Sequence, residues 1–349
     1  MRAVSRLIVV FAILAVACSP DASEPDVPDT GTETPIPDVG GEPDAGGEPD
    51  AGGEPDVGGE PDVGGEPDVS GEPDVSGEPD VGEEPDVGEE PVTVPDYSEL
   101  GPYSVTTATA SMDTGDDCTM NYTRFSPEGT DPEVLVVLAH GFSRGQAQMA
   151  GWGEHMASWG IEVVTPQMCY LQAWNADHPA NGRTMANLAR GLADDRPVVL
   201  AGHSAGGLAA VLAASEGGFT ALLGLDPVDN SNQGQAVASD LSLPAAALIA
   251  EPGSCNSSAN GTAMFDPISD RGLYRIDGTS HCSYENPSDF GCDFLCGAST
   301  ADDDAVQLAL SALMTAFAMW HGAGEDAAAA WWTPGAAEFD SIAPLLTEL

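Results

Sequence analysis

The stretch Gly202-His203-Ser204-Ala205-Gly206 has the pattern G-x-S-x-G and lies between an apolar run, residues 197–201, and a run of small residues, 205–215. In this pattern the serine lies on a sharp turn from a strand into a helix, and the two glycines leave room for the turn. The hydroxyl would project at the carboxyl edge of a sheet, beside a helix N-terminus that favours negative charge. The pattern predicts that Ser204 is a nucleophile.

A serine nucleophile needs a general base from elsewhere in the chain. His281 follows the last expected strand, residues 273–276, and comes after Ser204 in the chain, so it is the favoured base. His203 precedes the serine directly and is expected to be buried beneath the turn in a structural role. His155 and His321 lie on expected helices and are expected to be surface or core residues, and His178 to line the pocket rim. His140 belongs to a separate motif described below.

A carboxylate must orient the base and stabilise its protonated form. Asp226 stands at the end of an expected strand, residues 221–225, and Pro227 would end that strand. Glu251 ends the next strand and is the alternative acid, with Asp229 as a lesser rival. We favour Asp226, partly because of the family resemblance described below.

The same chemistry needs donors for the negative charge that develops on a substrate carbonyl. His140-Gly141-Phe142 follows an apolar run, residues 134–138, and Gly141 permits close approach of the backbone. The amides of Phe142 and Ala205 are therefore the expected oxyanion hole. A plain structural turn is the simpler interpretation of the His-Gly pair by itself.

These residues need a sheet whose strand ends meet at one edge. Short apolar runs alternate with helical patterns after residue 103, which predicts an α/β fold with a mostly parallel twisted sheet and helices on both faces. The expected strands are residues 103–110, 119–126, 134–138, 161–165, 197–201, 221–225, 245–250 and 273–276, the first two as an antiparallel pair. The expected helices are residues 149–158, 185–193, 205–215 and 305–321.

The motifs HGF, GHSAGG and GLDPVD, with a histidine after the final strand, resemble the chlorophyllase and dienelactone-hydrolase-like branch of the α/β-hydrolases. They are also similar to bacterial cutinase-like polyester hydrolases. The resemblance covers about residues 100–320 and implies an α/β-hydrolase fold that cleaves esters. Chlorophyllases commonly carry arginine where Ala205 stands, so the implied activity is ester cleavage in general.

The N-terminal part has a different texture. Residues 1–18 combine two arginines with an apolar run and end in Ala-Val-Ala-Cys, which resembles a bacterial lipoprotein signal with Cys18 as the lipidated residue. An ordinary secretory signal is the alternative.

Residues 19–99 contain the repeat GEPD[AV]G with proline in every unit, which predicts a disordered acidic tether. Residues 100–349 are then the catalytic domain. The protein is expected to be exported, as an outer-membrane or cell-surface lipoprotein or else secreted.

The composition excludes several classes of function. The chain of 349 residues has nine basic residues, all arginine, and 57 acidic ones, for a formal net charge of −48. Chemistry that needs a lysine, such as a Schiff base or a Walker A phosphate loop, is therefore absent. Strong negative charge repels phosphate backbones, so nucleic-acid binding is not expected. Of the 57 acids, 27 lie in residues 19–99.

Seven cysteines are present, and six remain if Cys18 carries lipid. An exported location would allow three disulfides, whose pairing the sequence leaves open among 15 arrangements. Zinc is the alternative, but there is no CxxC pair and His281 is expected to act as the base, so we expect no metal. The disulfide candidates are Cys118, Cys169, Cys255, Cys282, Cys292 and Cys296.

Two functions from different classes fit these observations. The first is a serine hydrolase that cleaves carboxylic esters through an acyl-enzyme, without a cofactor, as a monomer whose partners are the ester and, through the lipid, a membrane. The second is a catalytically silent α/β-hydrolase fold that serves as a surface binding or adhesion module. Reaction with an ester and with a serine-directed reagent would separate them.

Overall fold

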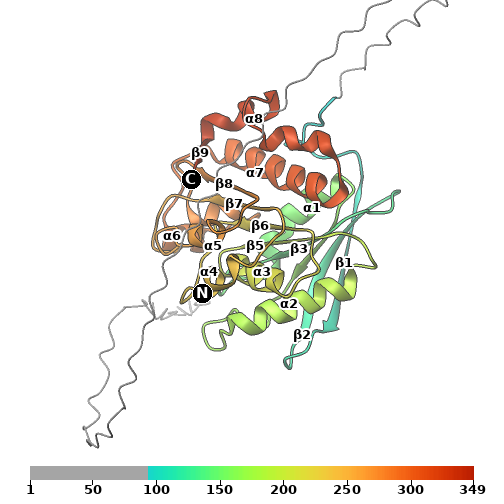
Figure 1. Cartoon of the computed structure of the whole chain (residues 1–349), viewed down its shortest axis with the longest axis vertical. Helices are drawn as coiled ribbons and strands as arrows, with labels where there is room; N and C mark the ends of the chain where they lie inside the picture. The colour runs from blue at the N-terminus through green and yellow to red at the C-terminus, as the bar shows by residue number, and fades with distance from the viewer. Residues whose placement is uncertain (1–92) are drawn as a thin grey trace, which may run out of the picture. The chain divides into compact units, whose positions relative to one another are not determined.

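The computed structural model describes residues 93–349, which form a nine-stranded mixed sheet with helices (Figure 1). This part of the chain is an α/β fold, as the alternation of patterns predicts. The expected signal segment, Cys18 and the repeats lie outside the described residues. The predictions made for them therefore stay predictions.

The sheet has the strand order β1-β2-β4-β3-β5-β6-β7-β8-β9. Neighbouring strands from β4 to β8 are parallel, whereas β1, β2 and β9 are joined to the sheet by antiparallel pairing. The strands are β1 Val105–Asp113, β2 Thr119–Pro127, β3 Leu135–Ala139, β4 Glu162–Pro166, β5 Val198–His203, β6 Ala221–Leu225, β7 Ala245–Ile249, β8 Arg271–Ile276 and β9 Leu346–Glu348.

The central strands are continuous apolar runs, such as LVVLA in β3 and ALLGL in β6, and every residue in both is buried. A strand covered by helices on both faces has no solvent side, so it does not alternate between polar and apolar residues. The edge strand β1 differs, because most of its side chains are exposed. The position of the continuous runs thus identifies the middle of the sheet.

Helices cover both faces of the sheet (Figure 1). One buried cluster joins the sheet to α1, α7 and α8, and a second joins it to α2, α3, α4 and α5. The helices are α1 Ala150–Ser158, α2 His178–Leu192, α3 Ala205–Ser215, α4 Gln233–Ala238, α5 Thr262–Phe265, α6 Phe290–Cys296, α7 Asp303–Ala318 and α8 Ala337–Ile342. Both layers hold apolar faces against the sheet, as the fold requires.

Helix α2 begins at His178, seven residues before the apolar pattern at residues 185–193, and its start lies in the stretch 177–183, whose composition is typical of a helix cap. The carboxylate of Asp177 accepts a hydrogen bond from the amide of Ala180 at 3.0 Å and so caps the first turn. A proline follows at the start of the helix, where its missing N–H costs nothing. The apolar period starts only later, which is why the pattern alone placed the start too far along the chain.

The folded part also begins earlier than the expected boundary at residue 100. Tyr97 is only 2% exposed and belongs to the core beside α1. Its carbonyl oxygen is 2.9 Å from Nε2 of His155, and the indole of Trp331 donates to the carbonyl of Pro95 at 3.0 Å. The end of the segment assigned to the tether is therefore part of this domain.

One stretch among residues 93–349, Asp303–Ala323, is long and apolar enough to cross a membrane by length and composition. It includes α7, and 67% of its most apolar window is buried inside the domain. Its buried side chains lie in the same cluster as the sheet. We therefore interpret it as a core helix.

All six cysteines among the described residues form disulfides. The pairs, which the sequence left open, are Cys118–Cys169, Cys255–Cys296 and Cys282–Cys292. Disulfides persist in oxidising environments and are rare in a reducing cytoplasm. The three bonds therefore favour an extracytoplasmic location.

Candidate active site

Ser204 occupies the turn between β5 and α3 with φ 57° and ψ −125°, a backbone conformation that residues with a side chain seldom adopt. A Cβ atom at Gly202 would lie 2.2 Å from the carbonyl oxygen of Gly206, and one at Gly206 would lie 2.5 Å from that of His140. Only glycine fits at either position. The two glycines of the motif therefore allow the tight turn that places Ser204 at the N-terminus of α3.

Ser204, His281 and Asp226 lie together in one hydrogen-bonded chain. The hydroxyl oxygen of Ser204 is 2.9 Å from Nε2 of His281, and Nδ1 of His281 is 2.5 Å from Oδ2 of Asp226. With its proton on Nδ1, the imidazole donates to the carboxylate and accepts from the serine. The three residues come from the ends of β5 and β6 and from the loop after β8.

The acid is held by donors of its own. Asp226 is fully buried, and its Oδ1 accepts from the amide of Ala250 at 2.9 Å. The side-chain amide of Asn256 lies 3.2 Å from both carboxylate oxygens. Asn256 is 1% exposed, and its own oxygen accepts from the amides of Gly253 and Ala259. No sequence pattern points to Asn256, because it lies in the irregular loop after β7.

The other two candidate acids have different partners. Glu251 accepts from the amide of Gly278 at 3.1 Å and lies 3.5 Å from Nε of Arg275. Asp229 accepts from two amides at the start of α4. Within residues 93–349, Asp226 is the carboxylate that contacts His281.

The two expected oxyanion donors flank Ser204. Phe142 lies in the loop after β3, and Ala205 is the first residue of α3. A Cβ atom at Gly141 would lie 3.1 Å from Cβ of Ser204, so this loop contacts Ser204. In the part of the chain that the structure describes, neither amide donates to a protein acceptor. Both are therefore free to bind an oxyanion.

His140 holds the loop after β3 that carries Phe142, here called the oxyanion loop (residues 140–145). Its Nδ1 donates to the carbonyl of Gly141 at 2.8 Å, and its Nε2 accepts from the amide of Met168 at 3.1 Å. Burial lowers the pKa of His140 to about 4, so the ring is neutral and can keep this pattern of one donor and one acceptor. The neutral imidazole of His140 therefore holds this loop in place through hydrogen bonds and adds no charge beside the pocket.

A pocket of about 320 Å³ opens beside Ser204 and His281. Its walls include Phe142 from the oxyanion loop, Leu295 and Cys296 from α6, and Arg144. A larger pocket of about 450 Å³, lined by α7, α8 and residues 94–98, has no histidine in its lining. The smaller pocket is therefore the candidate site, because chemistry can occur there.

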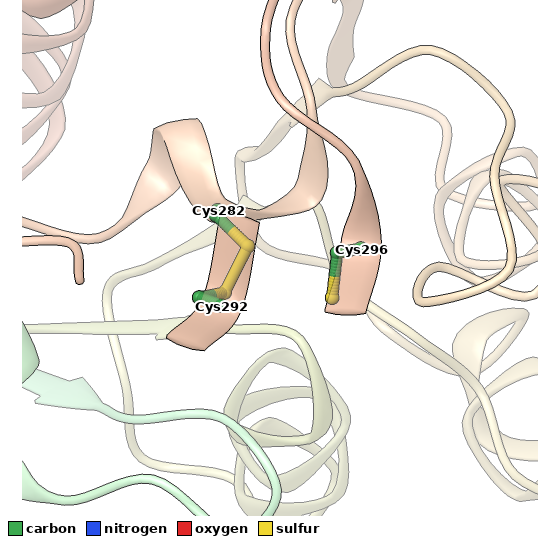
Figure 2. A group of neighbouring side chains, drawn as sticks. All are labelled: Cys282, Cys292 and Cys296. Carbon is green, nitrogen blue, oxygen red and sulfur yellow. A yellow bond between two sulfur atoms is a disulfide. The ribbon is translucent and has the colours of Figure 1, made fainter. Parts of the chain in front are cut away.

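Helix α6 forms one wall of this pocket and is tied at both ends by disulfides. Figure 2 shows the Cys282–Cys292 bond with the side chain of Cys296 beside it; Cys296 is itself bonded to Cys255. The sulfurs of Cys282, Cys292 and Cys296 lie within 4.8 Å of one another, as zinc ligands would. Because zinc binds thiolates and these sulfurs are in disulfides, the cluster in this state offers no such ligands.

A buried ion pair joins the loop that carries Phe142 to the loop that carries His281. Arg144 donates through Nε and Nη2 to the two oxygens of Glu285, at 2.7 and 2.5 Å, and also to Asp289 at 2.6 Å. Glu285 is 1% exposed, and burial raises its pKa although Arg144 acts in the opposite direction. Neither residue was singled out from the sequence, because 141 positions separate them.

Removing the Arg144 guanidinium should leave a buried carboxyl group without its partner. We expect Arg144→Met to lower the free energy of unfolding by about 3 kcal/mol, measured by urea unfolding. Arg183→Met is the matched control, because the pair of Arg183 with Asp116 is exposed on both sides and should contribute at most about 1 kcal/mol. Equal losses of unfolding free energy in the two variants would contradict the claim that the buried ion pair contributes more to stability than the exposed one.

The arrangement can activate a hydroxyl, hold a negatively charged oxygen and protonate a leaving group. Those are the requirements of acyl transfer through a serine. A comparison of the chain with models of protein families found no match. A comparison with curated proteins found no significantly similar sequence.

Proposed function

We propose that this protein is a serine hydrolase of the α/β-hydrolase fold that cleaves carboxylic esters through an acyl-enzyme. The observation that carries the proposal is the continuous hydrogen-bonded chain from Ser204 through His281 to the fully buried Asp226. A serine with a nearby histidine is common in proteins. A histidine that is also aligned by a buried carboxylate, at a strained strand-to-helix turn, is the arrangement of a nucleophile and its base.

In the proposed reaction, Oγ of Ser204 attacks the ester carbonyl while Nε2 of His281 takes the hydroxyl proton. The amides of Phe142 and Ala205 bind the oxyanion of the tetrahedral intermediate. The imidazolium then gives its proton to the departing alkoxide, which leaves as the alcohol, and Ser204 remains acylated. Water enters next, gives a proton to His281 and attacks the acyl carbon. When the second tetrahedral intermediate breaks down, the imidazolium returns this proton to Oγ of Ser204, which releases the acid and regenerates the serine and the neutral histidine.

The order of the parts along the chain supports the α/β-hydrolase fold. In that fold the nucleophile, the acid and the histidine follow one another, and one oxyanion donor comes from the loop after the third strand. Here Ser204 follows β5, Asp226 follows β6, His281 follows β8, and Phe142 follows β3. The resemblance in the motifs supports the same assignment.

An uncharged ester suits the pocket best. Phe142, Leu295 and the sulfurs of α6 provide apolar walls, and the one cation in the lining, Arg144, is already paired with two carboxylates. A substrate carboxylate would therefore meet net negative charge. Neutral acyl and alcohol groups avoid this repulsion.

We further propose that the enzyme is exported and held at an outer membrane or cell surface by lipid on Cys18, with residues 19–99 as a tether. The three disulfides support export, and the signal-like sequence before Cys18 supports the lipid. The mass of the N-terminal peptide of the mature protein tests this. A peptide that begins at Cys18 with added acyl mass is expected, and an unmodified N-terminus would refute the lipid.

The proposed activity is tested by a burst assay and by active-site labelling. With p-nitrophenyl butyrate in excess, we expect nitrophenol to be released at a constant rate. This steady phase either begins at once or follows a burst of at most one equivalent of nitrophenol per enzyme. A fluorophosphonate should add one phosphonyl group, which peptide mass analysis should locate on Ser204. No hydrolysis of any short neutral ester and no labelling would favour the silent binding module instead.

A further inference from the structure

The ring of His203 lies against the ring of the proposed base. The two ring centroids are 4.5 Å apart, with an angle of 39° between the ring planes. His203 is 1% exposed and is the residue directly before the nucleophile in the G-x-S-x-G turn. A buried polar ring at this position needs a partner, because an unsatisfied buried donor is costly.

The partner of the ring is the backbone of His281 itself. Nε2 of His203 lies 3.0 Å from the carbonyl oxygen of His281. A carbonyl oxygen can only accept, so Nε2 must carry the proton. Nδ1 is then an acceptor, and it has no hydrogen-bond partner in the described part of the chain. The nearest carboxylate oxygen, of Glu285, is 3.8 Å away.

His203 is held in the neutral form. Burial lowers the pKa of His203 well below its ordinary value, and the charge on a protonated His281 lowers it further. This matters because His281 becomes an imidazolium during the proposed reaction. A second positive ring at 4.5 Å would oppose that step, whereas a neutral ring does not.

We propose that His203 is a positioning residue for the catalytic base, acting through its Nε2–H on the carbonyl oxygen of His281; this rests on the proposed function. His281 opens a short 3-10 turn, His281–Tyr284, in the loop after β8, so its backbone is not fixed by a strand. Its ring must nevertheless hold two hydrogen bonds, of 2.9 and 2.5 Å. The hydrogen bond from His203 ties that backbone to the turn that carries Ser204, so nucleophile and base share one rigid support.

A matched pair of variants tests the donor. In His203→Gln the amide nitrogen can reach the position of Nε2 and keep the hydrogen bond, whereas in His203→Asn the amide ends near the position of Nδ1 and cannot. We expect the Gln variant to keep kcat for p-nitrophenyl butyrate within about threefold, and the Asn variant to lose about ten- to a hundredfold, both with little change in KM. Equal kcat in the two variants, whether both high or both low, would overturn the proposal.

The wild-type protein supplies a second readout that does not depend on the folding of a variant. Nitrogen-15 NMR of the histidine rings should show His203 as the neutral tautomer with its proton on Nε2, unchanged between pH 5 and 8. A tautomer with the proton on Nδ1, or titration in this range, would overturn the proposal even if the Asn variant failed to fold. Failure of the proposed function is distinct: the wild-type protein would then be inactive towards esters and fluorophosphonates, whatever the state of His203.

Discussion

Replacement of Ser204 with alanine should lower kcat for p-nitrophenyl butyrate by about a millionfold, on the scale of nucleophile removal in serine hydrolases. The variant loses the atom that forms the acyl-enzyme, and His281 keeps no hydroxyl to activate at 2.9 Å. The oxyanion amides remain, so a small residual rate is expected from electrostatic stabilisation alone. Because alanine also fits the turn no worse than serine, thermal unfolding should change little.

Ser215→Ala is the control for this substitution. Ser215 ends the same helix, α3, and its hydroxyl donates to the carbonyl of Leu212 at 2.7 Å, away from the pocket. It should keep the wild-type kcat and the fluorophosphonate label. Retention of more than about one hundredth of the wild-type kcat by the purified Ser204→Ala protein would show that the ester is cleaved elsewhere.

Asp226→Asn should lower kcat by about ten-thousandfold while the fold is retained. The carboxylate at 2.5 Å holds the proton of His281 on Nδ1, which leaves Nε2 free to accept from Ser204. An asparagine amide can instead donate to Nδ1, which moves the proton to Nε2 and blocks acceptance from the serine. The loss therefore comes from the wrong tautomer of the base, and steady-state kinetics at pH 7 to 8 measures it.

Glu251→Gln is the matched control for the acid. The change is the same loss of one charge on a residue at the end of a neighbouring strand, but Glu251 contacts the Gly278 amide and Arg275. We expect its kcat to stay within about threefold of wild type, since it does not touch the reacting groups. A larger loss in Glu251→Gln than in Asp226→Asn would mean that the acid is assigned to the wrong strand.

Part of this site could be predicted because it depends on local rules. The glycines at 202 and 206 are required by sterics within the turn itself, so they point to Ser204 as the proposed nucleophile without knowledge of the rest of the fold. The buried strands are also visible as continuous apolar runs. Asp226 follows such a run, His281 follows the less apolar strand β8, and parallel strands bring their carboxyl ends to one edge.

Other parts depend on contacts between distant segments, for which the sequence holds no local pattern. Asn256 supports the acid from an irregular loop, and Arg144 and Glu285 meet across 141 positions. Helix α6 was not predicted, because its seven residues, FGCDFLC, expose Phe290, Phe294 and Leu295 and show no buried apolar face. Its position is set by two disulfides, whose pairing follows from the tertiary fold.

The two bonds that hold α6 also connect it to the loops that carry His281 and Asn256. Cys282 is adjacent to His281, and Cys255 is adjacent to Asn256, so each bond joins α6 to a segment beside the base or beside the support of the acid. Both bonds need an oxidising environment to form. The geometry of the pocket therefore belongs to the oxidised protein. Recombinant enzyme for every assay described above should be produced in an oxidising compartment, since material from a reducing cytoplasm would lack these links.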